Sequence, residues 1–419
     1  MDNAHQIRIY EREELLSKEW KGKSDIIPVN NQQHSFDTLK RQKIFEKSLF
    51  EIENELERYN NYREEWYRRA KEFDPGDAPL AVCCELVSYC NLNCSMCYTI
   101  TEEYQSSVIG AQRILPWSIV KKIIDECAEL KIPSMLFSWR GESTLYHSMD
   151  KNGNKKNLPD VLSYARKKGI LEITCLTNGQ ILDPKMAEAI VEAEPSWISI
   201  SIDGLEDNYN KIRTPFHKRV SDYNAFNTVV NNIKKIISLR NNRGKKRPQI
   251  RTNTIFPPIA NDPYAYQKFM RDIGIGWITV NEILDFRSKE IPESSIIENW
   301  ACQYPFQRLT VSANGSILPC TGAHNEEREM VIGRYTGSRK KEVKKGNSTI
   351  IIDNPERNLS ESWHCSELKN IRNLHKENRR KEIEVCRYCR HGAIKHGVEW
   401  IPDDWDMDNM VWTECIWKK

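Results

Sequence analysis

Three cysteines stand close together in one short stretch. Cys90, Cys94 and Cys97 have the spacing C-x3-C-x2-C, and Tyr98 follows at once. A closed structural zinc site takes four protein ligands, so three thiolates are one too few for it. They are the right number to bind three irons of a 4Fe–4S cubane while the fourth iron stays open for a substrate. A zinc site that borrows a distant fourth ligand is the alternative.

A second set of four cysteines follows in the last third of the chain: Cys302, Cys320, Cys386 and Cys389. The first two flank a predicted hairpin, because Asn314-Gly315 stands between alternating apolar residues. The last two form a C-x2-C pair. Four thiolates can close a zinc site or bind all four irons of a second cubane. Thirteen cysteines without a secretion signal argue against a disulfide framework.

Polar residues gather at the ends of predicted strands between the two cysteine sets. They are Arg140-Gly141-Glu142, Thr177-Asn178, Ser201 with Asp203, and then Arg213. Taken singly, residues of these types are common in turns and at strand ends. Arg213 is equally suited to a carboxylate ligand or to an acid on the protein surface.

Six short apolar runs alternate with helical segments and position these groups. Strands are predicted over 81–88, 134–139, 172–176, 197–202, 249–256 and 277–283. Alternation of this kind predicts parallel βαβ units with right-handed crossovers, which curl into a barrel or partial barrel. Chemistry in such barrels lies where strands end and loops begin.

The chain divides into four parts on these patterns. Residues 1–78 are predicted to be a helical amino-terminal extension, and residues 79–300 the α/β partial barrel. A small carboxy-terminal domain with the second cysteine set covers 301–397, and an aromatic tail covers 398–419. The extension and the tail are both candidates for a homodimer contact.

Composition excludes several kinds of partner. The formal net charge is +3, with 62 basic and 59 acidic residues, so no strong field favours nucleic acid or an acidic membrane. No apolar run approaches transmembrane length, and the amino terminus has no signal-peptide core. We therefore expect a cytoplasmic protein without membrane or nucleic-acid partners.

The first cysteine stretch and the strand-end motifs together resemble the radical S-adenosylmethionine (SAM) enzymes. In that family the open iron binds SAM, whose cleavage yields a 5′-deoxyadenosyl radical, on a partial (β/α)6 TIM-like barrel. The resemblance implies a cofactor-binding role for Tyr98, Gly141, Glu142, Thr177, Asn178, Ser201 and Asp203, and catalytic roles for Arg140 and Arg213. Arg140 replaces the first glycine and Ser143 the proline of the family's G-G-E-P motif, so that match rests on Gly141 and Glu142.

The second cysteine set is similar to the shortened SPASM ("twitch") domain of the same enzymes, which carries one auxiliary 4Fe–4S cluster. The resemblance implies dehydrogenation of a sugar- or cyclitol-like small molecule, with the auxiliary cluster accepting the substrate electron and a donor such as flavodoxin or ferredoxin supplying the first one. A peptide-modifying enzyme, a sugar epimerase with Cys175 or Cys365 as hydrogen donor, and a zinc-stabilised binding protein remain alternatives.

Overall fold

The structure is a computed structural model of the 419-residue chain. It describes residues 5–10, 34–35, 46–52, 54–101, 104, 113–216, 223–255, 257–259, 262–281, 301–323, 326, 330–337, 339–345, 348–389, 397–399 and 410–412. Of the tail's four tryptophans, only Trp412 falls within these ranges. In these ranges no helix has the length and apolar character needed to cross a membrane.

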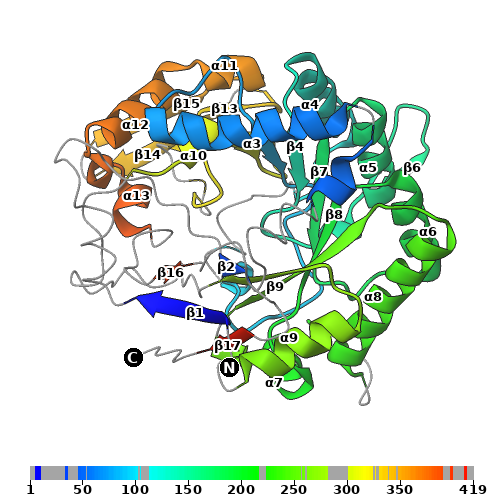
Figure 1. Ribbon diagram of the computed structural model, residues 1–419. Coiled ribbons are helices and arrows are strands. Elements are labelled where there is room, and N and C mark those ends of the chain that lie inside the picture. The colour runs from blue at the N-terminus through cyan, green and yellow to red at the C-terminus, as the bar shows by residue number, and fades with distance from the viewer. Residues whose placement is uncertain are drawn as a thin grey trace.

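Six parallel strands form the centre of the fold, in chain order and without interruption. They are β3 (Ala81–Cys84), β4 (Ser134–Phe137), β7 (Glu172–Thr177), β8 (Trp197–Ser201), β9 (Gln249–Ile255) and β10 (Trp277–Asn281). The mixed α/β class with a parallel sheet is therefore confirmed (Figure 1). A short strand, β2 (His34–Ser35), pairs antiparallel with β10 at the edge.

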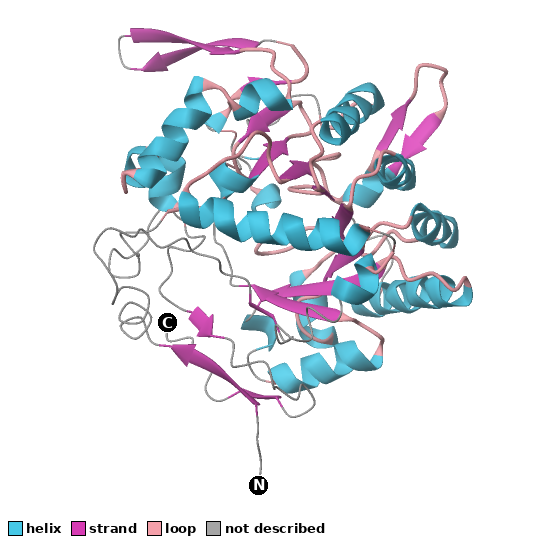
Figure 2. Cartoon of the chain, turned by 45° about the horizontal axis from the view of Figure 1, so that its top comes forward, coloured by secondary structure: helices cyan, strands magenta, loops and turns pink. Residues whose placement is uncertain are grey.

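Helices connect the strands and cover the outside of the sheet, as Figure 2 shows. They are α4 (Trp117–Glu129), α5 (Leu158–Lys167), α6 (Pro184–Ala193), α7 (Glu206–Ile212), α8 (Ala225–Asn242) and α9 (Pro263–Asp272). Side-chain caps start several of them, and Asn157 forms a capping box with Asp160. A small hairpin, β5 (His147–Met149) with β6 (Lys155–Asn157), precedes α5.

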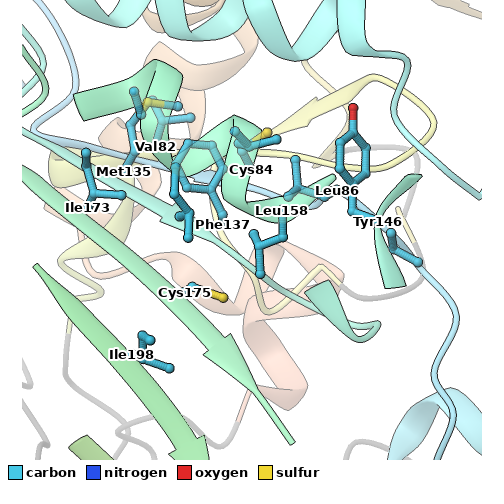
Figure 3. Packing of buried hydrophobic residues seen from close by; sticks show 14 of the residues in the cluster. Val82, Cys84, Leu86, Met135, Phe137, Tyr146, Leu158, Ile173, Cys175 and Ile198 are labelled. Atoms are coloured by element: carbon cyan, nitrogen blue, oxygen red, sulfur yellow. The ribbon is translucent and has the colours of Figure 1, made fainter. Parts of the chain in front are cut away.

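The main core lies between the sheet and these helices. Every second strand residue, such as Met135, Phe137, Ile173 and Ile198, belongs to it (Figure 3). Side chains alternate between the two faces of a strand, so the intervening residues face the inside of the curved sheet. That inner face carries many polar side chains, among them Ser134, Thr174, Ser199 and Arg251.

The amino-terminal extension contributes a helix that covers the beginnings of the strands. This helix is α3 (Glu55–Glu72), the long blue helix in Figure 1. Tyr59 and Tyr62 of α3 pack in a second apolar cluster with residues just before or at the strand starts, namely Leu80, Leu171, Trp197 and Trp277. The Tyr62 hydroxyl donates to the Glu172 carboxylate at 3.3 Å.

The carboxy-terminal part continues the same sheet. Strand β11 (Arg308–Val311) pairs parallel with β3, and β12 (Ser316–Leu318) and β13 (Gly333–Arg334) extend it antiparallel. The helices here are α10 (Tyr304–Gln307), α11 (Leu359–Trp363), α12 (Ser366–Lys376) and α13 (Glu384–Tyr388). A hairpin of β14 (Arg339–Lys345) and β15 (Ser348–Asn354) follows β13.

The two ends of the chain meet in a small separate sheet. Strand β1 (His5–Tyr10) pairs antiparallel with β16 (Gly397–Glu399) and parallel with β17 (Met410–Trp412). The extension therefore contains strands in addition to its predicted helix.

Candidate functional site

The loop with the first three cysteines follows β3 and is fixed by backbone hydrogen bonds to the segment after α7. Asn93 N donates to Thr214 O at 2.7 Å, and Ser95 N donates to Ile212 O at 3.2 Å. A turn brings Cys97 N to Cys94 O at 2.9 Å. These hydrogen bonds hold the loop against the end of α7 and the residues that follow it.

The Cys90 and Cys94 thiols lie in a largely buried environment that disfavours free thiolates. Burial, followed by the nearby Glu142 carboxylate, raises the pKa of Cys90 to about 12. Burial raises the pKa of Cys94 to about 11 even though the Arg213 guanidinium acts in the opposite direction. A cationic cluster stabilises thiolates and releases their protons on binding, so the donor set fits a 4Fe–4S cluster.

Gly141 supports this loop from the end of β4. A Cβ atom at this residue would lie 2.3 Å from Val87 O and 2.7 Å from Tyr89 O, both backbone atoms leading into the loop. The next residue, Glu142, donates its N–H to Tyr89 O at 3.0 Å. Only glycine allows the two backbone segments to approach this closely.

The Glu142 side chain joins the segment after β4 to the end of β7. It is 2% exposed and accepts from Thr144 N at 3.0 Å, Thr144 Oγ1 at 2.7 Å and Asn178 N at 2.7 Å. It also accepts from Thr177 Oγ1. Asn178 Nδ2 in turn donates to Asn91 Oδ1 at 2.8 Å and lies 3.7 Å from Cys90 Sγ. The structure thus brings the predicted residues Glu142, Thr177 and Asn178 together beside the cysteine loop.

A second buried group links the end of β8 to the same loop. Arg213 Nε and Nη2 lie 2.7 and 2.6 Å from Asp203 Oδ2, and Arg213 Nη1 lies 3.9 Å from Cys94 Sγ. The other Asp203 oxygen accepts from Ile255 N at 2.9 Å. Ser201, the neighbouring predicted residue on β8, is paired with Asn253 and partly exposed.

Arg140 has a different environment from the one predicted for a catalytic arginine. It pairs with Glu85, which is fully buried, at 2.7 Å, and with Glu326 of the carboxy-terminal part at 2.9 Å. The Glu85 carboxylate also accepts from Ala313 N at 2.9 Å. These contacts connect the barrel to the carboxy-terminal part, and a catalytic role for Arg140 stays a prediction.

Tyr98 lies immediately after the cysteine loop and is buried. Its ring packs edge-on against Tyr104 with centroids 5.2 Å apart, and the Tyr104 hydroxyl donates to Ser88 O at 2.7 Å. The aromatic pair therefore packs against the backbone that leads from β3 into the loop.

The second set of cysteines comes together from three segments: before α10, after β12, and in and after α13. Burial, followed by the neighbouring Cys320 and Cys389, raises the pKa of Cys302, so these thiols lie within electrostatic reach of one another. Among the described residues, no three His, Cys, Asp or Glu side chains converge as ligands of a single ion would. A cubane needs no such convergence, because each thiolate binds a different iron.

His375 is a residue of this second site that sequence reasoning missed. It is 1% exposed, and its Nδ1 accepts from Cys302 N at 3.1 Å. The proton of the neutral ring is therefore on Nε2, which lies 3.6 Å from Cys386 Sγ. Burial lowers the pKa of His375 to about 3, which keeps the ring neutral. A single histidine in an amphipathic helix carries no signal of this role.

The two cysteines considered as hydrogen donors serve the fold. Cys175 is 2% exposed and belongs to the core between sheet and helices, so it faces away from the inside of the barrel. Cys365 precedes α12, and its Sγ accepts from Leu368 N at 3.4 Å, which caps that helix. Neither position suits a hydrogen donor to a substrate inside the barrel.

Comparison with known proteins identifies two family matches. The radical SAM superfamily matches residues 85–246, and the SPASM iron–sulfur cluster-binding domain matches residues 302–390. The chain is 33% identical over 124 residues to an Fe-coproporphyrin III synthase from Methanosarcina barkeri, covering 30% of this chain and 27% of that protein. It is 29% identical over 149 residues to a serine-type anaerobic sulfatase-maturating enzyme from Bacteroides thetaiotaomicron, covering 35% and 34%.

The match thus spans between about a quarter and a third of the length of these two relatives. Among solved structures, native anSMEcpe with bound AdoMet has 13% identity and a TM-score of 0.49, over 77% of this chain and 93% of that one. BtrN in complex with AdoMet and 2-DOIA has 16% identity and a TM-score of 0.42, over 74% and 92%.

Proposed function

Since this chain is a radical SAM enzyme with a carboxy-terminal iron–sulfur cluster-binding domain, we propose that it dehydrogenates a hydroxyl-bearing small molecule of the sugar or cyclitol class. The cofactors are SAM, the 4Fe–4S cluster that binds it and an auxiliary 4Fe–4S cluster. When bound, they supply one-electron cleavage of SAM, hydrogen abstraction from a carbinol C–H and acceptance of the electron left on the substrate. The net change converts a carbinol and SAM to a carbonyl, methionine, 5′-deoxyadenosine and one proton.

Each site residue has a defined part in this proposal. Cys90, Cys94 and Cys97 hold the SAM-binding cluster, and the four later cysteines hold the auxiliary one. Glu142 and its partners Thr177 and Asn178 shape the edge of the cofactor pocket, as their shared hydrogen bonds beside Cys90 suggest. The Asp203–Arg213 pair fixes the opposite edge.

One observation carries the proposed electron transfer: both cysteine sets are attached to strands of one continuous sheet. The three-cysteine loop follows β3, β3 pairs with β11, and Cys320 lies just past β12 on the next strand. The buried group of Glu85, Arg140 and Glu326 holds the same two regions together. A fixed separation between the sites is what repeated electron transfer requires.

The test uses a Cys386→Ala/Cys389→Ala variant, reconstituted anaerobically and given SAM, reductant and a panel of sugars, cyclitols and peptides. We expect about half the iron of the parent, since each site holds one cubane. We also expect continued 5′-deoxyadenosine formation but no oxidised product by mass spectrometry. Cys365→Ser is the matched control, because serine retains the helix cap and the ligand set is untouched. Zinc in the parent, with equal iron in both proteins, would refute the electron-acceptor role.

Modification of a peptide is the second candidate. The similarity to a sulfatase-maturating enzyme over 149 residues favours it, and the peptide arm of the same product screen decides between the two. Either reaction needs a low-potential electron donor, for which flavodoxin or ferredoxin is the proposed partner, and the proposed setting is the reducing cytoplasm.

A further inference from the structure

Arg251 lies on the inner face of the curved sheet, in the amino-terminal half of β9. Its neighbour Ile250 is buried in the core under the helices, so the Arg251 side chain points to the opposite side. Its Nε donates to Ser199 Oγ at 2.8 Å, and Asn253 Nδ2 donates to the same hydroxyl at 2.9 Å. The guanidinium is therefore oriented by neutral partners within the barrel.

Among the described residues, Arg251 has no direct ion-pair partner. Within the described part of the chain, no carboxylate lies within ion-pair distance of Arg251, and Ser199 is its one side-chain hydrogen-bond acceptor. Glu172, the nearest acid in its electrostatic surroundings, accepts instead from Ser134 Oγ at 2.7 Å and Trp197 Nε1 at 3.0 Å. Burial lowers the pKa of Arg251, although the Glu172 carboxylate acts in the opposite direction.

Arg308 of β11 repeats this arrangement on another part of the inner face. Its guanidinium stacks on Tyr304 at 3.3 Å from the ring centroid, and Nη2 donates to Thr321 Oγ1 at 3.0 Å. Its Nε is buried with no hydrogen-bond partner, as is the Thr310 hydroxyl on the same face of β11. Across the described residues, Arg308 has no carboxylate within ion-pair distance either.

Arg251 and Arg308 are half-buried, and among the described residues neither has a carboxylate within ion-pair distance, although Arg308 acts electrostatically on the nearby Cys302 thiol. Such an arrangement is costly for a fold to maintain, because buried charges are normally paired. A guanidinium offers five N–H donors in a fork that matches oxyanions. We propose that the inside of this barrel binds a substrate bearing anionic oxygen groups, either carboxylate or phosphate, with Arg251 as the principal contact and Arg308 as a second. The proposal rests on the proposed function only in placing the substrate inside the barrel.

The depth of Arg251 indicates how such a substrate would lie. Ile255, whose N–H contacts Asp203 beside the cysteine loop, is four residues further along β9. At ~3.3 Å per strand residue, Arg251 lies ~13 Å from Ile255, in the direction of the strand beginnings. The anionic end would therefore point toward the strand beginnings, and the carbon that reacts would lie nearer the cysteine loop.

Binding of small anions tests the proposal without requiring turnover. The reconstituted protein and its Arg251→Met and Arg308→Met variants are heated with rising inorganic phosphate or malonate, against sodium chloride at equal ionic strength. A ligand that binds only the folded protein raises its unfolding temperature in a concentration-dependent way. We expect Arg251→Met to need at least tenfold higher anion concentrations than the parent for the same rise in unfolding temperature. The increase in the required anion concentration should be smaller for Arg308→Met.

Phosphate and malonate form separate arms, and the more effective anion identifies the oxyanion class of the substrate. Without added anion, Arg251→Met should unfold at or above the temperature of the parent, because an unpaired cation is removed. Arg166→Met is the matched control. That arginine is also half-buried, but it lies 3.9 Å from the Glu55 carboxylate and donates to Glu194 O and Ser196 Oγ at 2.9 and 3.1 Å. Its loss should therefore destabilise the protein without altering the anion response.

Two results would overturn the inference. One is an equal anion response in the parent and Arg251→Met, with Arg251→Met destabilised like the control. The other is weakened SAM binding in Arg251→Met, which would assign this arginine to the cofactor. A failure of the proposed dehydrogenation would appear in the product screen alone and would leave the anion response intact.

Discussion

Replacing Arg140 should show whether the Glu85–Arg140–Glu326 group joins the two parts of the protein or performs catalysis. The Arg140 and Glu85 side chains are 3% and 0% exposed, and Glu326 is 7% exposed. Burial alone would lower the pKa of Arg140, but the two carboxylates outweigh it and raise the pKa. In Arg140→Met, both carboxylates would remain buried without their cation.

Removal of one partner from a buried ion pair costs about 3–5 kcal/mol. For a chain of this size we expect the thermal midpoint of the reconstituted protein to fall by roughly 3–6 °C. Glu85→Gln should cost a similar amount. The double variant Arg140→Met/Glu85→Gln should be more stable than the sum of the single changes predicts, because residues in one network are coupled by about 0.5–3 kcal/mol.

The assay is anaerobic thermal unfolding at one scan rate, with iron content measured on each variant. Strict additivity of the two changes, or a loss under about 1 kcal/mol in Arg140→Met, would refute the structural role. The Arg140→Lys variant distinguishes a catalytic role of Arg140 from a structural one. If it unfolds like the parent but forms no 5′-deoxyadenosine, Arg140 acts in catalysis as the sequence suggested.

Three further changes test other parts of the site. Gly141→Ala should displace the cysteine loop, because its Cβ would lie 2.3 Å from a backbone oxygen; iron analysis should find the first site empty and the second filled. Glu142→Gln and Asp203→Asn should each weaken SAM binding roughly ten- to a hundredfold, the worth of a buried charged hydrogen bond, and unchanged equilibrium dialysis would contradict this. His375→Asn should make the auxiliary cluster harder to reduce by EPR-monitored titration, because it loses the N–H that faces Cys386 Sγ at 3.6 Å, whereas His375→Gln should retain the parent potential.

The order of strands and the two cysteine sets were predictable because their signals are local. Alternating apolar runs and helical segments place β3 to β10 in chain order, and the spacing of Cys90, Cys94 and Cys97 needs eight residues of sequence. The motif residues Glu142 and Asn178 could be assigned to strand ends for the same reason. Their shared contacts beside the cysteine loop follow once parallel strands end at one edge.

Contacts between distant segments could not be predicted. In the sequence, Glu85 is a single charged residue within an apolar run, and its partner Arg140 is 55 residues away. His375 meets Cys302 across 73 residues, and only the packing of α12 against α10 brings them together. The pairing of β11 with β3, which makes one sheet of two predicted domains, likewise has no local signal. Terminal strands as short as β1 and β16 are set by their partners rather than by propensity.

The helix α3 also bears on the order of events during turnover. Because Tyr59 and Tyr62 pack over the beginnings of the strands, that end of the barrel is covered by the chain itself. We expect substrate, SAM and products to pass through the opposite end, past the cysteine loop. We expect binding and release to follow a fixed order: a substrate that reaches as deep as Arg251 binds before the cofactor and is released after it. Its release, and not the radical chemistry, would then limit the rate of each cycle.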